Sequence, residues 1–156
     1  GLLGPAGTDK PETAVATAAA GLPQALGAMG NGVVDCGRWT RTSSTNDIMR
    51  LADCTIVVVR PDLAGVAHLQ ARMELLLASS GGRLGVVLVG ERPYCVDNVA
   101  KAIGMRNVTT IPVDRQGVDA LHGAASQRVA RSSPLIRSAR SILDALTKAP
   151  ADAVFA

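Results

Sequence analysis

The strongest constraint on the fold is an alternation between short apolar runs and segments long enough to form a helix. Runs rich in β-branched residues occupy residues 32–36, 54–60, 84–89 and 108–113. Their apolar residues are consecutive, which is typical of strands buried on both faces. Helix-length connections predict right-handed crossovers between parallel strands. We therefore predict an α/β fold, a three-layer, doubly wound arrangement with a mostly parallel sheet flanked by helices.

The connecting segments carry helix signals. Asp62 is placed to cap a helix that runs to the Gly81-Gly82 pair, with apolar residues at spacings of three and four. Further helices are expected at residues 94–104, around 118–122 and at 134–148. Ser44 or Thr45 is expected to cap a short helix that ends at Leu51, with Ile48 and Leu51 facing inward. An Ala-rich stretch at residues 8–30 predicts one kinked helix or two short ones.

Length and composition favour one domain. The chain has 156 residues, of which only 2% are aromatic, so the core must be built from Val, Leu, Ile and Ala. We predict a single domain over residues 1–150 and a frayed tail over 151–156. The opening "GLLGPAG" resembles the end of a strand, so we expect the natural protein to extend further on the N-terminal side.

The charge and the cysteines point to a reducing, cytoplasmic location. The net charge of +3 is mildly basic and ordinary for this length. Cys36, Cys54 and Cys95 are odd in number and lack CxxC spacing, which argues against a disulfide framework and against a zinc site. No signal peptide is visible, and no apolar run is long enough for a membrane span.

Ligands of such sheets bind beyond the carboxyl ends of the strands, so the residues that follow each run are the candidate site. The carboxylate of Asp35, just before Gly37, is suited to the water shell of a magnesium ion. The simpler interpretation, a turn cap or a pair with Arg38, is favoured by the residues alone. Asp114 has two interpretations as well, as a helix cap or as a neighbour of a base, and capping is favoured. No GxSxG motif supports nucleophilic catalysis.

A basic stretch near the C-terminus is a candidate contact for nucleic-acid phosphates or for an acidic partner. It contains Arg128, Arg131, Arg137 and Arg140. The simpler interpretation, a solvated helix face, is favoured. No aromatic residues are interleaved, so stacking on single strands is not expected.

The order of these segments resembles the C-terminal part of ParA/MinD-like ATPases. "GVVDCGRW" resembles the Walker-B-like strand of that family, and "LADCTIVVVRPDLAGVAHL" resembles its next unit. "RLGVVLVGERPY", "VTTIPVD" and "RSSPLIRSARSILDAL" are similar to the following strand, the last strand and the C-terminal helix. The resemblance covers residues 32–146 and is strongest to actinobacterial MinD-like proteins linked to chromosome partitioning, septum placement or secretion.

The resemblance implies roles for particular residues. Asp35 would be the magnesium-associated carboxylate and Gly37 part of the nucleotide site. The segment from Pro112 through Val113 to Asp114 would lie against the adenine. The family usually has Asn after the "VVLV" strand, where this chain has Gly90 followed by Glu91 and Arg92. That departure puts adenine recognition in doubt.

The larger departure is the phosphate-binding loop, because the sequence contains no GKT or GKS. Two explanations fit, a piece of a longer protein or a degenerate relative, and the first is favoured. The first implies an ATPase, using ATP and magnesium, that forms a homodimer around ATP and positions DNA or a protein complex. The alternative is a non-catalytic scaffold that binds protein partners. A receiver-like domain ranks last, because Asp35 lacks an acidic partner near the N-terminus.

Overall fold

The computed structural model describes residues 20–21, 32–39, 45–123 and 126–148. These residues fall into two compact units, 1–52 and 53–156, which are described separately. The single domain expected from the sequence stays a prediction. The expected strand at the N-terminus and most of the Ala-rich stretch lie outside the described residues.

The first unit contains one described helix of several residues, α2 (Thr45–Leu51). Ile48 and Met49 are buried, as the pattern predicted for Ile48. Leu51 is 54% exposed, so the expectation that it faces inward is wrong. The Trp39 indole Nε1 donates a hydrogen bond to Asn46 Oδ1 at 3.0 Å, which ties the segment before α2 to the helix.

The strand expected at residues 32–36 is not formed. These residues have no regular secondary structure, and Val33 is 88% exposed. Asp35 Oδ1 accepts a hydrogen bond from the backbone N–H of Gly37 at 2.8 Å, and Gly37 has a positive φ of 63°. A side chain that binds nearby backbone offers the chain a turn in place of a sheet ladder. A local turn at Asp35 to Gly37 therefore ends the apolar run.

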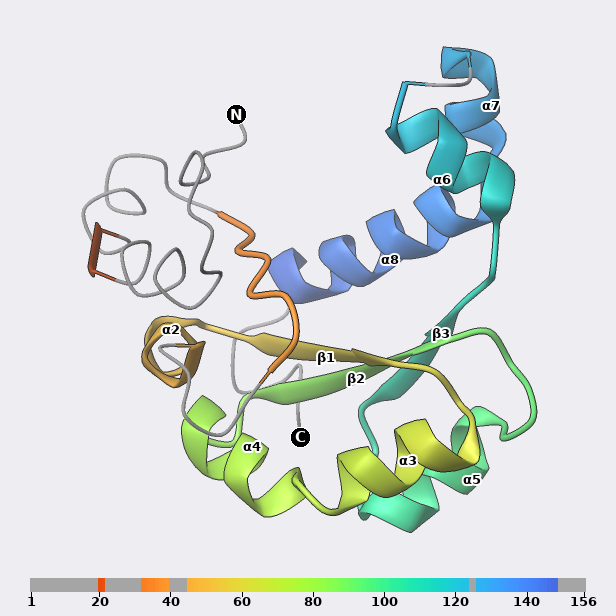
Figure 1. The fold of residues 1–156 in the computed structure, drawn as a ribbon. Coiled ribbons are helices and arrows are strands. Elements are labelled where there is room, and N and C mark those ends of the chain that lie inside the picture. Colours follow the sequence, from red (N-terminus) through yellow and green to blue (C-terminus); the bar gives the residue numbers. More distant parts are fainter. Residues whose placement is uncertain (1–19, 22–31, 40–44, 124–125, 149–156) are drawn as a thin grey trace. The chain divides into compact units, whose positions relative to one another are not determined.

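The second unit contains a parallel sheet in the order β1-β2-β3 (Figure 1). Its strands are β1 (Thr55–Val59), β2 (Leu84–Val89) and β3 (Val108–Ile111). The first register runs from Thr55 opposite Leu84 to Val59 opposite Leu88, and the second pairs residues 86–89 with 108–111. The predicted parallel arrangement is confirmed for these three strands.

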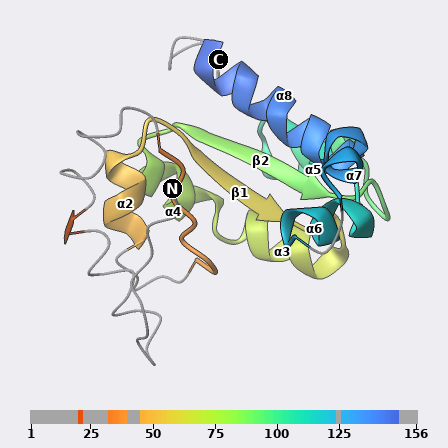
Figure 2. The ribbon, with the colours of Figure 1, turned by 90° about the horizontal axis from the view of Figure 1, so that it is seen from above.

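Helices cover both faces of this sheet (Figures 1 and 2). On one face lie α3 (Leu63–Gln70), α4 (Met73–Ser80) and α5 (Val96–Ile103). On the other face lies α8 (Pro134–Lys148), preceded by α6 (Arg115–Leu121) and α7 (Gln127–Ser132), which pack on one another and on the start of α8. The α/β class with flanking helices is thus confirmed.

The core lies between β2 and the helices α3, α4 and α5. Leu84, Val86 and Leu88 alternate along β2, so they share one face, and all three are almost fully buried. The buried residues opposite them come from the three helices and are Leu69, Met73, Leu76, Val99 and Ile103. Helix α8 has no buried residue, so the opposite face is covered more loosely.

The long helix expected after Asp62 is broken in two. The backbone N–H of Arg72 bonds to the carbonyl of Leu69 rather than to that of His68, which an unbroken α-helix would use. The guanidinium of Arg72 instead donates a hydrogen bond to the carbonyl of His68, at 3.1 Å. The sequence pattern did not reveal the break because Leu69, Met73 and Leu76 keep helical spacing across it.

Other boundaries shift by a few residues. Strand β3 ends at Ile111 rather than at residue 113, because Pro112 has no N–H to extend the ladder. Helix α6 begins at Arg115, earlier than expected, and α7 was not predicted. Helix α8 has the expected bounds. Within the described ranges, no helix has the length and apolarity needed to cross a membrane.

Candidate functional site

The carboxyl ends of all three strands open onto one hollow of about 580 Å³. This volume lies within the range of small-molecule sites. The lining residues follow each strand in turn: Arg60, Pro61 and Asp62, then Val89 to Pro93, then Pro112 and Val113. The hollow thus brings together five residues that the sequence nominated for nucleotide binding, namely Gly90, Glu91, Arg92, Pro112 and Val113.

The loop that carries Glu91 and Arg92 is tied to the strands on both sides. The N–H of Gly90 donates to the carbonyl of Ile111 at 2.8 Å, and the Thr110 hydroxyl lies 3.0 Å from the carbonyl oxygen of Gly90. Further on, the N–H of Tyr94 donates to the carbonyl of Pro61 at 3.1 Å. Gly90 has a positive φ of 91°, which glycine adopts without strain. The backbone around Glu91 and Arg92 is therefore anchored to both β3 and the end of β1.

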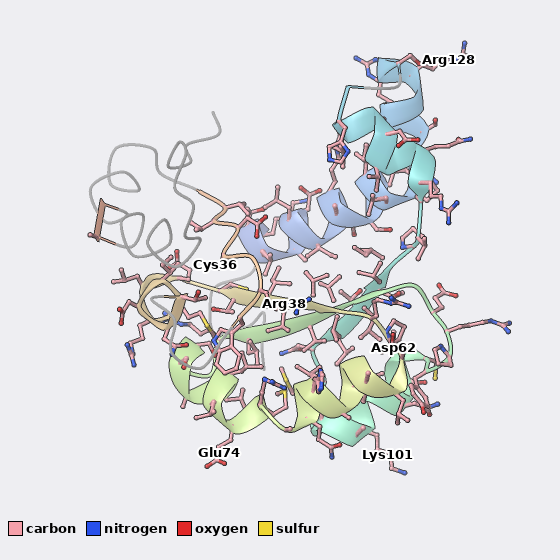
Figure 3. All side chains as sticks on the ribbon, viewed as in Figure 1. Cys36, Arg38, Asp62, Glu74, Lys101 and Arg128 are labelled. Carbon is pink, nitrogen blue, oxygen red and sulfur yellow. The ribbon has the colours of Figure 1, made fainter. Side chains whose placement is uncertain are left out.

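Asp62 shapes the rim of the hollow at the end of β1, where Figure 3 labels it. Its Oδ1 accepts the N–H of Gly65 at 2.7 Å and caps α3, as predicted. Its Oδ2 lies 3.3 Å from Nε of Arg60. A Cβ added to Gly65 would overlap the carbonyl oxygen of Arg60, so only glycine lets α3 start this close to the strand.

The polar groups of the hollow differ in what they already bind. Arg60 and Asp62 pair with each other. Glu91 and Arg92 are exposed and, among the described residues, have no hydrogen-bond or ion-pair partner. Among the residues that the structure describes, the lining of the hollow has no hydroxyl or thiol. The arrangement can therefore bind a ligand through one carboxylate and one guanidinium.

Asp114 follows Val113 but does not line the hollow. Its Oδ1 accepts the N–H of Gly117 at 2.9 Å and caps α6, and its Oδ2 accepts the hydroxyl of Ser133 at 2.7 Å. The hydrogen bond from Gly117 and then the one from Ser133 lower the pKa of Asp114. The capping interpretation is confirmed, and a contact with a base stays a prediction.

Ser133 makes a structural contact that the sequence reasoning missed. It is buried, and its Oγ also accepts the N–H of Ile136 at 3.2 Å at the start of α8. The signal was present, because Ser followed by Pro134 is typical of an N-cap with proline in the first helical position. Asp114 and Ser133 together join the start of α6 to the start of α8.

Asp35 and Gly37 belong to the first unit, where the hydrogen bond between them forms a turn. The interpretation of Asp35 as a turn cap is confirmed. Burial, and then the negative charge of Asp35, raise the pKa of the neighbouring Cys36 thiol. In the part of the chain that the structure describes, no three His, Cys, Asp or Glu side chains gather as metal ligands. The assignment of Asp35 to magnesium stays a prediction.

The four arginines of the basic stretch are exposed on α7 and α8, and none lines the hollow. Figure 3 shows Arg128 at the outer end of α7. Lys148 lies 3.8 Å from Asp144, whereas these four arginines form no ion pair within the described ranges. They are therefore available to an anionic partner.

Comparison with known proteins gave no match, since no family model, curated protein or solved structure is significantly similar to this chain.

Proposed function

We propose that this chain is a ParA/MinD-like domain that binds a nucleotide in the hollow at the carboxyl edge of its sheet. The system it serves would be one of chromosome partitioning, septum placement or secretion. One observation carries the proposal: adjacent parallel strands bring Gly90, Glu91, Arg92, Pro112 and Val113 to a single hollow of about 580 Å³. Open parallel sheets bind their ligands at this edge.

The base of the nucleotide would pack against Pro112 and Val113. Val113 is 71% exposed, so it offers apolar surface that a planar base can cover. Glu91 and Arg92 would then meet the polar edges of the base. Arg60 adds a further positive charge at the rim, partly balanced by Asp62.

Hydrolysis by these 156 residues alone is not expected. The sequence has no GKT or GKS, and phosphoryl transfer depends on the backbone and lysine contacts that such a loop provides. The chain would bind nucleotide in the manner of an ATPase fragment that lacks its phosphate anchor.

The second candidate is a non-catalytic scaffold that keeps the fold and binds protein partners. One observation favours it: the carboxylate of Asp35, the residue that the resemblance assigns to magnesium, is held by its own turn. An ATPase fragment needs that carboxylate at a strand end, whereas a scaffold does not.

Isothermal titration with ATP and magnesium tests the proposal. We expect weak binding that disappears in Val113→Trp, because the new indole fills the hollow from an exposed position. Leu121→Trp, on an exposed position of α6 outside the hollow, is the matched control and should bind like the wild type. Asp35→Ala should not change binding if the scaffold candidate is right, and should weaken it if Asp35 serves magnesium. No binding of any nucleotide at millimolar concentration would refute the nucleotide proposal.

The resemblance also implies non-specific DNA and a second copy of the chain as partners. Arg128 and Arg131 on α7 and Arg137 and Arg140 on α8 would contact DNA phosphates. Retention on DNA should then fall steeply with salt, and replacing two of these arginines with alanine should reduce the salt dependence by about two counterions. Light scattering with and without nucleotide tests the homodimer.

A further inference from the structure

We propose that the base bound in the carboxyl-edge hollow is guanine; this inference rests on the proposed nucleotide binding. Its starting point is the pair of adjacent side chains, Glu91 and Arg92, that line the hollow without a partner among the described residues. Where the resemblance leads one to expect an amide side chain, the hollow presents a carboxylate and a guanidinium. The hydrogen bonds that these two groups can form determine which base they can recognise.

A carboxylate only accepts hydrogen bonds, and it accepts two side by side. Guanine presents N1–H and N2–H as neighbouring donors, which match the two oxygens of Glu91. Adenine presents the acceptor N1 beside its amino group, so one carboxylate oxygen would face a lone pair. The Glu91 carboxylate therefore favours guanine over adenine.

A guanidinium only donates, and its fork matches two neighbouring acceptors. Guanine presents O6 and N7, the pair that Arg binds most often in nucleic-acid recognition, whereas adenine presents an amino donor beside N7. Arg92 thus favours the same base as Glu91. Both preferences follow from which atoms of the side chains and of the bases donate or accept hydrogen bonds. Glu91 and Arg92 therefore favour the same base.

The loop holds these side chains where a base could meet them. The hydrogen bonds of Gly90 to β3 and of Tyr94 to Pro61 fix the backbone on both sides of the pair. Arg60 and Asp62 already pair with each other, so they compete little for Glu91 or Arg92. A hollow of about 580 Å³ suits a single nucleotide rather than a folded nucleic acid.

The test compares the binding of GTP, ATP and xanthosine triphosphate by isothermal titration, using the full chain. We expect GTP to bind about tenfold or more tightly than ATP, the discrimination typical of a bidentate contact with a base. Glu91→Ala should reduce the ratio toward one. Arg92→Lys, which keeps the charge but loses the fork, should weaken GTP binding more than ATP binding.

Glu91→Gln is the sharpest variant, because misfolding cannot mimic its expected result. The amide offers one acceptor and one donor, which match N1–H and O2 of xanthine, so the variant should prefer xanthosine triphosphate over GTP. Glu74→Gln, an exposed position on α4 outside the hollow, is the matched control and should keep the wild-type preference. Equal binding of GTP and ATP by the wild type, or preference for ATP, would overturn the guanine assignment and leave nucleotide binding standing. Absence of binding to all three would overturn both.

Discussion

The close approach of α3 to the end of β1 predicts that Gly65→Ala destabilises the fold. Alanine in place of glycine inside a helix ordinarily stabilises by about 1 kcal/mol. Here the added Cβ would overlap the carbonyl oxygen of Arg60, and it would lie 3.1 Å from Oδ1 of Asp62. The Arg60 oxygen belongs to the backbone, so the clash is relieved only by moving the strand end or the helix start. Such overpacking typically costs about 1–3 kcal/mol.

Because the clashing atom belongs to the backbone, the upper part of that range applies, about 2–3 kcal/mol, and subtracting the helix-propensity term of about 1 kcal/mol leaves a net loss of about 1–2 kcal/mol. For a unit of about 100 residues this lowers Tm by about 5–15 °C. Thermal unfolding followed by circular dichroism measures the shift. Ala64→Gly, at the exposed neighbouring position, is the control and should cost only the helix-propensity term of about 1 kcal/mol. An unchanged or raised Tm in Gly65→Ala would show that α3 does not approach the strand this closely. Nucleotide binding should weaken with the Tm shift, because Arg60 and Asp62 line the hollow.

The remaining predictions concern the core and the contact between α6 and α8. Leu88→Ala should cost about 3 kcal/mol in urea unfolding because Leu88 is fully buried, whereas Leu63→Ala, at an exposed position, should change stability by less than about 0.5 kcal/mol. Ser133→Ala removes the N-cap of α8 and should cost about 1 kcal/mol or more, whereas Ser141→Ala on the exposed face of α8 should not destabilise. Because the pKa of Asp114 is lowered, its carboxylate stabilises the fold above its ordinary pKa and loses this effect as pH falls through the lowered value. The stability difference between wild type and Asp114→Asn should therefore be largest near neutral pH and should shrink below about pH 4; a constant difference would contradict the assigned hydrogen bonds.

The sequence predicted best the elements whose signals are strong and local. β2 has the predicted bounds because an uninterrupted apolar run fits a central strand. Helix α8 also has the predicted bounds, because its apolar residues recur at helical spacing from Leu135 to Leu146. Helix capping by Asp62 and Asp114 was also predictable from the sequence, because each residue directly precedes a helical segment.

Predictions failed where one side chain competes with the regular backbone pattern. The run at residues 32–36 has the composition of a strand, but Asp35 turns the backbone before a ladder can form. The break between α3 and α4 depends on the guanidinium of Arg72 reaching the carbonyl of His68, which no periodicity reveals. The candidate hollow was predictable from topology, because parallel strands end at one edge. The pairing of Arg60 with Asp62, which leaves Glu91 and Arg92 to a ligand, required the structure.

The loop between β2 and α5 is fastened through main-chain atoms at its two ends, the amide and carbonyl of Gly90 and the amide of Tyr94. None of these ties uses the side chains of Glu91 or Arg92. Substitutions at these two positions can therefore alter which ligand the hollow binds while leaving the sheet and its crossovers intact. Single substitutions in this loop can change the ligand while the fold is kept, so chains that share this fold can evolve different ligand specificities.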